Sequence, residues 1–342
     1  MAAKRSTFVI CARNVGADNQ FGGEPAEISF LRVPAGKDRY DAGLAMKADS
    51  WRKYLMAAAD GEEDELTGLR GNILVFIHGY NNDIPTIVWR TRKLQETLDD
   101  AGWKGVVVAF DWPCENSTLN YLEDRSDAAS VADKLVSDVI PMLVSAPDAA
   151  CVLNVHLIGH STGAYVIQEA FSRATTKGEL FRAEWRIAQV VLIGGDIAAD
   201  SLDASSQWSG PMFDRIVRLT NYQNRHDSVL GVSNAKRLGT SPRVGRVGLT
   251  AQAHSKCVNV DCTHYFEGKD PTHSDFQGTF CHSWHIGDPT FALDLALTLE
   301  ADIDRLALPT RARGIDGLAL QPGLRPQFQS QWLAAAPPLV VG

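Results

Sequence analysis

Apolar and polar residues follow one another in blocks whose lengths suit strands and helices in turn. Short continuous apolar runs have the length of strands that are buried on both faces. Between these runs, apolar residues recur at the three- and four-residue spacing of amphipathic helices. The expected strands are 8–12, 28–33, 73–77, 106–110, 152–158, 190–193, 216–219 and 258–262, and the expected helices are 83–101, 128–143, 164–174 and 288–303. Strands that alternate with helices predict a mostly parallel sheet with helices on both faces.

Polar caps and prolines mark the boundaries of several helices. Asp83 and Asp288 stand where a side chain can cap the first turn. Pro85 and Pro289 follow them, in the first turn, where a missing N–H costs nothing. Pro141 lies inside an expected helix, and it predicts a kink or an early end there.

The strands account for one domain and a tail. Segments 8–12 and 28–33 are separated by a Gly-Gly pair and are expected to form an antiparallel edge pair. One α/β sheet of about eight strands accounts for residues 6–307 as a single domain. Residues 308–342 are rich in Pro, Gly and Gln, and we expect them to form an irregular tail.

Composition narrows the class of protein. The chain has 342 residues, 45% hydrophobic and 22% charged, with a formal net charge of −8. This charge argues against a general nucleic-acid binder, which needs a basic surface to neutralise phosphates. No apolar stretch approaches the roughly 20 residues of a membrane span, and no targeting segment is evident, so we expect a cytoplasmic protein. Its six cysteines are too sparse for a disulfide framework and are expected to be reduced.

One segment carries the pattern of a catalytic serine. Residues 159–163 read Gly-His-Ser-Thr-Gly, between the expected strand 152–158 and the expected helix 164–174. A strand, a sharp turn and a helix present the hydroxyl of Ser161 at the apex, and the flanking glycines remove side chains that would collide there. The alternative is an inert serine at a glycine-flanked turn. The pattern and its context together favour a nucleophile.

A second loop is expected to help bind the negatively charged oxygen (the oxyanion) that forms when the serine attacks its substrate. Residues 78–82 read His-Gly-Tyr-Asn-Asn and directly follow the strand 73–77. We expect the backbone N–H groups of Tyr80 and Thr162 to hold the negative oxygen of the reaction. The side chains expected to line the substrate site are His78, Asn81, Trp112 and His160.

A catalytic serine needs an acid and a base. Where a strand, a sharp turn and a helix present the serine, the acid and then the base follow it along the chain. Asp227 lies just beyond the strand 216–219, and Asp196 directly follows the strand 190–193. Acids from both places occur, and Asp227 is the favoured candidate. The base is expected between the last strand and the last helix, where the histidines are His264, His273, His282 and His285. His282 is favoured, with His285 second, because a base close to a firm helix start is better held.

Two other classes compete with an enzyme of this kind. Cysteines and histidines crowd the region 257–285, which raises the alternative of a structural zinc site, but their spacing fits no compact finger and we expect no metal. A binding protein on a hydrolase scaffold is the other alternative, because fold alone does not establish activity. A binding protein has no need for a serine, an acid, a base and both loops together.

Several segments together resemble a bacterial α/β-hydrolase family, esterase- or lipase-like, that is known mainly as a domain of unknown function. The similarity covers roughly residues 70–300. The segments that carry it are Phe76–Asn82, Phe110–Pro113, Tyr121 with Asp124, Gly159–Gly163, Asn224–Asp227 and Cys281–Trp284. Thr162 departs from the family pattern, in which an apolar residue is common, although only its backbone N–H is needed.

The resemblance implies the α/β-hydrolase fold and supports Asp227 and His282 over their rivals. The expected chemistry is the cleavage of a small ester through an acyl-enzyme on Ser161, with no cofactor. Neither the residues nor the resemblance specifies the substrate.

Overall fold

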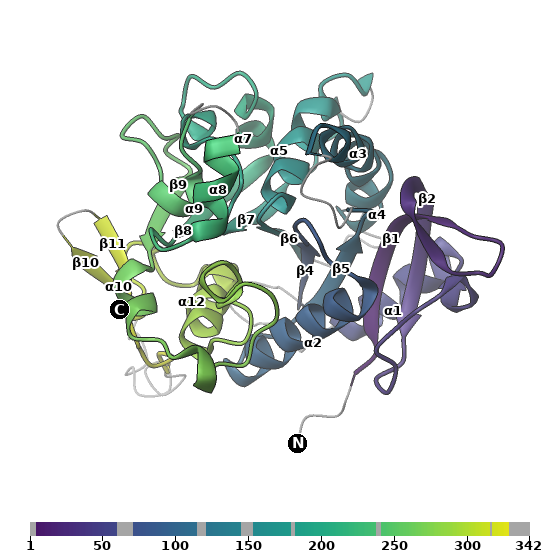
Figure 1. Cartoon of the computed structure of the whole chain (residues 1–342), viewed down its shortest axis with the longest axis horizontal. Coiled ribbons are helices and arrows are strands. Elements are labelled where there is room, and N and C mark those ends of the chain that lie inside the picture. The colour runs from purple at the N-terminus through teal and green to yellow at the C-terminus, as the bar shows by residue number, and fades with distance from the viewer. Residues whose placement is uncertain are drawn as a thin grey trace, which may run out of the picture.

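The protein is a single twisted sheet covered by helices on both faces (Figure 1). The computed structural model describes residues 5–59, 71–114, 121–144, 153–178, 182–236, 241–314 and 317–327. Within these residues the strand order is β10-β11-β9-β8-β7-β6-β4-β5-β1-β2-β3. The run from β11 to β1 is parallel, and antiparallel pairs occur only at the two edges. This is the α/β-hydrolase class that the sequence predicts.

The strands are β1 (Thr7–Val15), β2 (Phe21–Val33), β3 (Ala45–Met46), β4 (Gly71–Ile77), β5 (Val106–Asp111), β6 (Leu153–His160), β7 (Ile187–Ile193), β8 (Ile216–Gln223), β9 (Cys257–Asp261), β10 (Arg311–Gly314) and β11 (Gly317–Leu320). The helices are α1 (Ala48–Ala59), α2 (Ile84–Asp100), α3 (Tyr121–Lys134), α4 (Ile140–Val144), α5 (Gly163–Ala174), α7 (Gly210–Arg215), α8 (Ser228–Lys236), α9 (Val244–Val247), α10 (Thr263–Glu267), α11 (Phe280–Ser283) and α12 (Pro289–Glu300). Short 3₁₀ turns cover Ala42–Leu44, Ala199–Leu202 and Pro271–His273, and a π-helical turn covers Leu135–Val139.

The helices form two layers. Helices α2 and α12 pack on one face, where Leu94 and Leu295 join a core cluster with strand residues (Figure 1). Helices α1, α3, α5 and α7 cover the other face, where Trp51 and Ile167 belong to a larger cluster. The central strands are buried on both sides, which explains their continuous apolar runs.

Local sequence signals set the ends of the two helices on the first face. The Asp83 carboxylate accepts from Thr86 N at 2.9 Å, and the Asp288 carboxylate accepts from Phe291 N at 2.8 Å. Both caps confirm the sequence prediction. Around Pro141 the helical segment continues to Val144, but it is reached through a π-helical turn. Proline has no N–H for a regular helical bond, and a local change of pitch absorbs this loss.

Two edges of the sheet differ from the expectation. Strand β1 pairs with β2 as predicted, but it also pairs in parallel with β5, so the edge is the short β3. The expected irregular tail from residue 308 instead contains the hairpin β10–β11, which adds to the sheet beside β9. Its short strands at Arg311–Gly314 and Gly317–Leu320 contain few β-branched residues, so local pattern alone gave no strand signal.

The carboxyl ends of the parallel strands meet at one edge of the sheet. In register, Ile77 lies beside Gly159 and Phe110, and His160 lies beside Ile193. The order in which strands are added reverses between β4 and β6, because β4 leads to β5 on one side and β6 leads to β7 on the opposite side. Such a reversal opens a crevice at the strand ends, which is the usual place for a ligand site.

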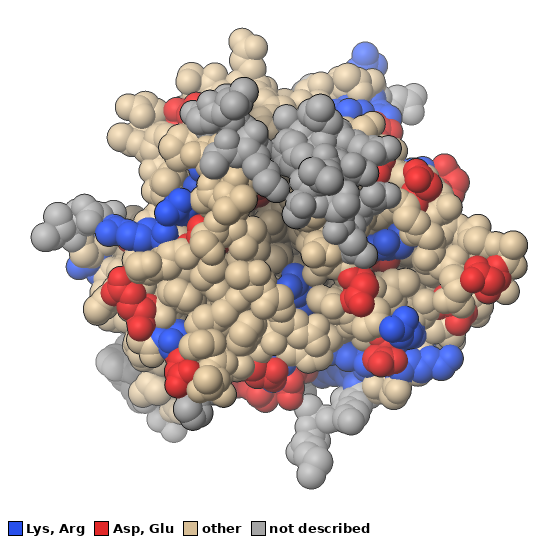
Figure 2. All heavy atoms as spheres, in the orientation of Figure 1, with Lys and Arg blue, Asp and Glu red and all other residues tan. Residues whose placement is uncertain are grey.

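None of the described helices combines the length and apolar composition needed to cross a membrane. The cysteines with described side chains, Cys11, Cys114, Cys257, Cys262 and Cys281, all carry free thiols. On the face seen in Figure 2, basic and acidic side chains are interspersed and separated by wide neutral areas.

Candidate active site

Ser161 occupies a strained turn between β6 and α5. Its φ is 55°, in the left-handed region that few residues other than glycine adopt. The backbone is held in this turn because Ser161 N donates to Ile193 O at 3.1 Å and Ser161 O accepts from Asp196 N at 3.0 Å. Strain that is fixed by neighbouring bonds is typical of functional sites.

The two glycines beside the serine leave no room for side chains. A methyl group at Gly163 would lie 2.2 Å from the carbonyl oxygen of Ile77. At Gly159 it would lie 2.8 Å from the backbone nitrogen of Ala164. The first turn of α5 therefore lies directly against strands β4 and β6. Within this turn Ala164 N donates to Ser161 O at 3.1 Å and Tyr165 N donates to Thr162 O at 2.9 Å, so the helix starts directly at the serine.

Asp227 and His282 form a hydrogen-bonded pair. The Nδ1 atom of His282 lies 2.6 Å from the Asp227 carboxylate, and both side chains are buried. Asp227 also caps α8, since its other oxygen accepts from Leu230 N at 3.0 Å. A carboxylate at Nδ1 holds the proton there and leaves Nε2 as the basic nitrogen.

The loop after β7 contacts both this pair and the serine turn. A methyl group at Gly194 would lie 3.0 Å from the His282 ring and 3.4 Å from the Asp227 carboxylate. The preceding residue, Ile193, accepts the bond from Ser161 N. The described hydrogen bonds include none between Ser161 and His282, and in free enzymes this contact commonly tightens only around substrate.

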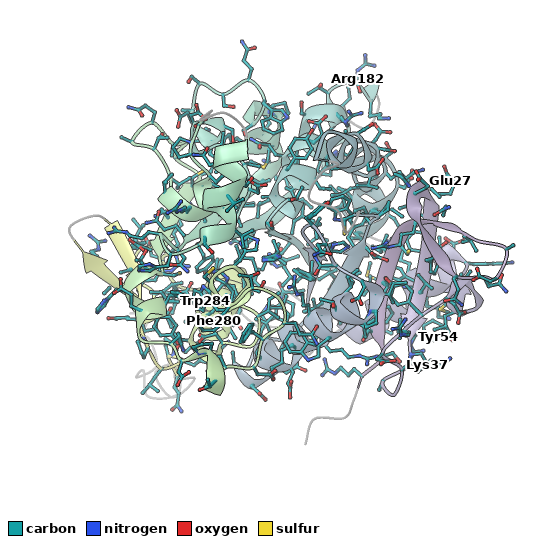
Figure 3. The ribbon with its side chains drawn as sticks, viewed as in Figure 1. Glu27, Lys37, Tyr54, Arg182, Phe280 and Trp284 are labelled. Carbon is teal, nitrogen blue, oxygen red and sulfur yellow. The ribbon has the colours of Figure 1, made fainter. Side chains whose placement is uncertain are left out.

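Aromatic packing anchors the helix that carries His282. Phe280 begins α11 and Trp284 directly follows its last residue, and both are labelled in Figure 3. Phe280 contacts Phe266 with ring centroids 5.2 Å apart, and Trp284 meets Phe291 of α12 at 6.4 Å. The base is therefore attached to a packed helix pair.

A buried arginine ties α2 to the same segment. Arg90 donates to Gln277 O at 2.8 Å and to Ser283 Oγ at 3.3 Å. Its Nη1 lies 3.5 Å from His160 Nδ1, and His160 Nε2 donates to His282 O at 3.0 Å. Burial lowers the pKa of Arg90 to about 10. Burial, together with the neighbouring His282, also holds the pKa of His160 well below its usual range. His160 is therefore a neutral link between the arginine and the base segment.

The loop after β4 lies against the serine. A methyl group at Gly79 would lie 2.5 Å from Ser161 Cβ. The Asn82 side chain donates to Gly79 O at 2.8 Å and to Tyr80 O at 3.0 Å, while Asn81 adopts a φ of 55°. The side chain of Asn82 thus closes the turn that carries the Tyr80 N–H.

A fully buried carboxylate lies beneath this loop. Asp111 accepts from Arg13 Nε at 2.9 Å, from Tyr40 OH at 2.5 Å and from Cys11 Sγ at 3.4 Å. His78 Nε2 lies 3.1 Å from the same group. Burial alone would raise the pKa of Asp111, but Arg13, His78 and Tyr40 outweigh it and lower the pKa to about 2.

Asp196 and His285, the alternative acid and base, have different partners from Asp227 and His282. Asp196 accepts from Ser233 Oγ at 2.9 Å and pairs with Arg243 at 3.5 Å, and burial raises its pKa to about 6. His285 is buried against Trp284 and Phe291, and neither ring nitrogen has a hydrogen-bond partner. Burial lowers the pKa of His285 to about 3, so this ring is neutral in the hydrophobic core.

Three of the four side chains expected to line the substrate site do not do so. His78 and Trp112 are 0% exposed and His160 is 2% exposed. They are held by internal bonds, such as that from Trp112 Nε1 to His78 O at 2.9 Å. Only Asn81 has an exposed side chain. A polar residue at a strand end can face inward as readily as outward, and periodicity does not distinguish the two.

No group of three or more His, Cys, Asp or Glu side chains suited to a metal ion occurs among the described residues. The structure describes the backbone of Tyr121, Asp124 and His273 but not their side chains.

The sequence predicted no role for the side chains of Arg13, Tyr40, Asn82, Arg90 and Asp111, although Asn82 and Asp111 lie in segments that carry the family resemblance. The signal that could have identified two of them is a charged residue next to an apolar run. Arg13 directly follows an apolar run, and Asp111 ends another, so each polar group lies at the end of a buried strand. A buried charge requires a partner, and the pairing of β1 with β5 brings these two together.

Comparison with known proteins points to a hydrolase family. Residues 62–278 match the family described as "Alpha/beta hydrolase of unknown function (DUF900)". No curated protein matches the chain.

Several solved structures resemble it at low sequence identity. A protein from Agrobacterium vitis S4 named as a hydrolase is 13% identical, with 87% of this chain and 99% of that chain covered and a TM-score of 0.38. Esterase B from Lactobacillus rhamnosis is 11% identical, with 88% of each chain covered and a TM-score of 0.38. A metagenomic carboxyl esterase is 13% identical, with 69% of this chain and 76% of that chain covered and a TM-score of 0.32.

Proposed function

Because this chain belongs to the family of alpha/beta hydrolases of unknown function (DUF900), we propose that it is a serine hydrolase that cleaves a carboxylic ester of a small molecule. Ser161 is the nucleophile, His282 the general base and Asp227 the acid that orients the base. The N–H groups of Tyr80 and Thr162 bind the oxyanion. An ester is the expected substrate because its leaving group departs more easily than that of an amide.

One observation carries the proposal. The Asp227–His282 hydrogen bond of 2.6 Å lies against Gly194, whose neighbour Ile193 fixes the strained turn at Ser161. An inert serine at a turn needs neither the strain nor a buried Asp–His pair beside it. Strain and a buried carboxylate–imidazole pair at one place are the arrangement that activates a hydroxyl.

In the proposed reaction, His282 Nε2 takes the proton of Ser161 as the hydroxyl attacks the acyl carbon. The tetrahedral intermediate places its negative oxygen at the Tyr80 and Thr162 N–H groups. His282 then gives the proton to the leaving alcohol, and an acyl-enzyme remains. Water, activated by the same base, releases the acid and restores the serine.

Fluorophosphonate labelling tests this proposal, since the reagent reacts with activated serines. We expect the wild-type protein and Ser172→Ala, a matched serine variant on α5, to be labelled. Ser161→Ala should lose the label and the hydrolysis of p-nitrophenyl acetate. A protein that stays unlabelled in its native state, or a Ser161→Ala variant that still hydrolyses the ester, would overturn the proposal.

A further inference from the structure

The peptide group between Gly79 and Tyr80 is held at its oxygen by two side chains. His78 Nδ1 donates to Gly79 O at 2.8 Å, and Asn82 Nδ2 donates to the same oxygen at 2.8 Å. The N–H of this peptide group belongs to Tyr80, the proposed oxyanion donor. The C=O and N–H of a peptide share one conjugated unit. Donors at its oxygen therefore strengthen the N–H as a donor at the other end.

The other ring nitrogen of His78 meets a carboxylate that cannot move. His78 Nε2 lies 3.1 Å from Asp111, which Arg13 and Tyr40 fix in place, and 3.2 Å from the backbone N–H of Trp112. The same loop has a second tie, because Arg13 Nη2 donates to Asn82 O at 3.4 Å. His78 also stacks on Trp112, with ring centroids 5.6 Å apart.

We propose that His78, held in place by Asp111, and Asn82 position and polarise the Gly79–Tyr80 peptide so that its N–H binds the oxyanion. The inference rests on the proposed function, since it concerns the oxyanion site of that reaction. His78, Asn82 and Asp111 are positioning residues, because they act on the reacting atoms only through a backbone group.

Charge on His78 follows from its neighbours. Burial alone would lower the pKa of His78, but the hydrogen bonds and charges of Asp111 and Cys114 outweigh it and raise the pKa to about 9. With this pKa His78 carries a proton on each ring nitrogen at neutral pH, with Nε2 facing Asp111. As the pH rises through about 9 the ring loses the Nε2 proton, and this nitrogen then accepts from the backbone N–H of Trp112. Oxyanion binding should weaken over that interval, and kcat should fall there.

Other groups near His78 also titrate. Burial holds the pKa values of Tyr40 and Cys11 well above their usual range, so these groups stay neutral through pH 9. Arg13 stays charged, because Asp111 raises its pKa despite burial. Cys114 is the competing titrating group: burial would raise its pKa, but its interactions with His78 lower it. The variant Cys114→Ser, which should keep the alkaline fall in kcat, separates the two.

Kinetics provide the first test. Asp111→Asn and His78→Leu should lower kcat for p-nitrophenyl acetate by about 10- to 100-fold and leave KM within about threefold, because the donor matters most in the transition state. His78→Asn, whose amide can still donate to Gly79 O, should lie between these variants and the wild type, without the alkaline fall. His156→Gln, a substitution of a buried histidine in mid-strand, is the control and should keep kcat within about twofold.

Affinity for a trifluoromethyl ketone, which forms the oxyanion on the enzyme, should fall in parallel with kcat. Equal affinity and equal kcat in the wild type and Asp111→Asn would overturn the inference while the proposed function stands.

The second test does not need activity. The chain has seven tyrosines, so a ¹⁵N-tyrosine sample gives few amide signals, and Tyr80→Phe identifies that of Tyr80. We expect the Tyr80 amide shift to titrate with a midpoint near pH 9 in the wild type and Cys114→Ser. The midpoint should fall in Asp111→Asn and the titration should vanish in His78→Asn.

A Tyr80 amide that is insensitive to pH and to Asp111→Asn would overturn the inference, whatever the labelling result. Failure of fluorophosphonate labelling would instead overturn the proposed function, and the amide titration would still decide whether His78 polarises the peptide.

Discussion

Two buried aspartates lie near the serine, and their contacts separate their roles. The carboxylate of Asp227 touches the imidazole of His282, whereas that of Asp196 is engaged by Ser233 and Arg243. The backbone N–H of Asp196 donates to Ser161 O at 3.0 Å. Burial is similar for the two side chains, so the partners decide which one orients the base.

Replacing each aspartate by asparagine tests this assignment. Asp227→Asn should lower kcat by about 10³- to 10⁴-fold, because the amide favours the wrong tautomer of His282. Asp196→Asn keeps the shape of the site and should change kcat by less than about tenfold. Steady-state kinetics on one ester measure both. The reverse order of effects would assign the acid to Asp196.

At the scale of elements, close contact between α5 and the sheet creates the site. Gly163 lets the first turn of the helix lie against Ile77 O, and Gly79 lets the next loop lie against Ser161. These two approaches bring two separate segments, the loop after β4 and the first turn of α5, against the serine turn. Neither approach would survive a side chain at the glycine.

We therefore expect Gly163→Ala to reduce the free energy of unfolding by about 1–3 kcal/mol or more, since the added methyl group overpacks a backbone contact. It should also abolish fluorophosphonate labelling. Gly210→Ala in α7 is the matched control, because a methyl group there meets no atom within 4 Å. Urea unfolding measures both variants. Equal stability of the two would contradict the close packing of α5.

At the scale of the whole molecule, the C-terminal hairpin is part of the domain. Arg311 of β10 donates to Asp294 of α12 at 2.6 Å, and both side chains are 0% exposed. Thr310 and Tyr222 donate to the same carboxylate. The hairpin, the last helix and β8 are thus joined by one buried charged group.

Removing one partner of this pair leaves a buried charge uncompensated. Arg311→Met should lower the free energy of unfolding by about 3–5 kcal/mol. Arg325→Met removes a partly exposed pair with Glu300 and a hydrogen bond from Arg325 Nε to Ala101 O, and it should cost about 1–2 kcal/mol. Urea unfolding of both variants gives the comparison. A cost for Arg311→Met no greater than that for Arg325→Met would show that the hairpin is not bound in this way.

How far the sequence predicts the fold and the site depends on whether a signal is local. Continuous apolar runs identify the central strands, because a strand that is buried on both faces needs apolar residues at adjacent positions. Asp83 and Asp288 identify the starts of two long helices, because a cap must lie directly before the N–H groups that it satisfies. Helix α1 and the hairpin β10–β11 gave no such signal, and packing against distant elements stabilises them.

The residues themselves determined the alternation that gives a parallel sheet and the glycines that allow a sharp turn at Ser161. Tertiary structure brings together Asp227 and His282, the pair that the sequence favoured. It alone decided that His285 and Trp112 face inward and that Arg13 reaches Asp111. The physical reason is that a buried charge or imidazole is defined by its partners, which come from strands about 100 positions away in the case of Arg13 and Asp111. Spacing along a chain carries no record of such a pairing.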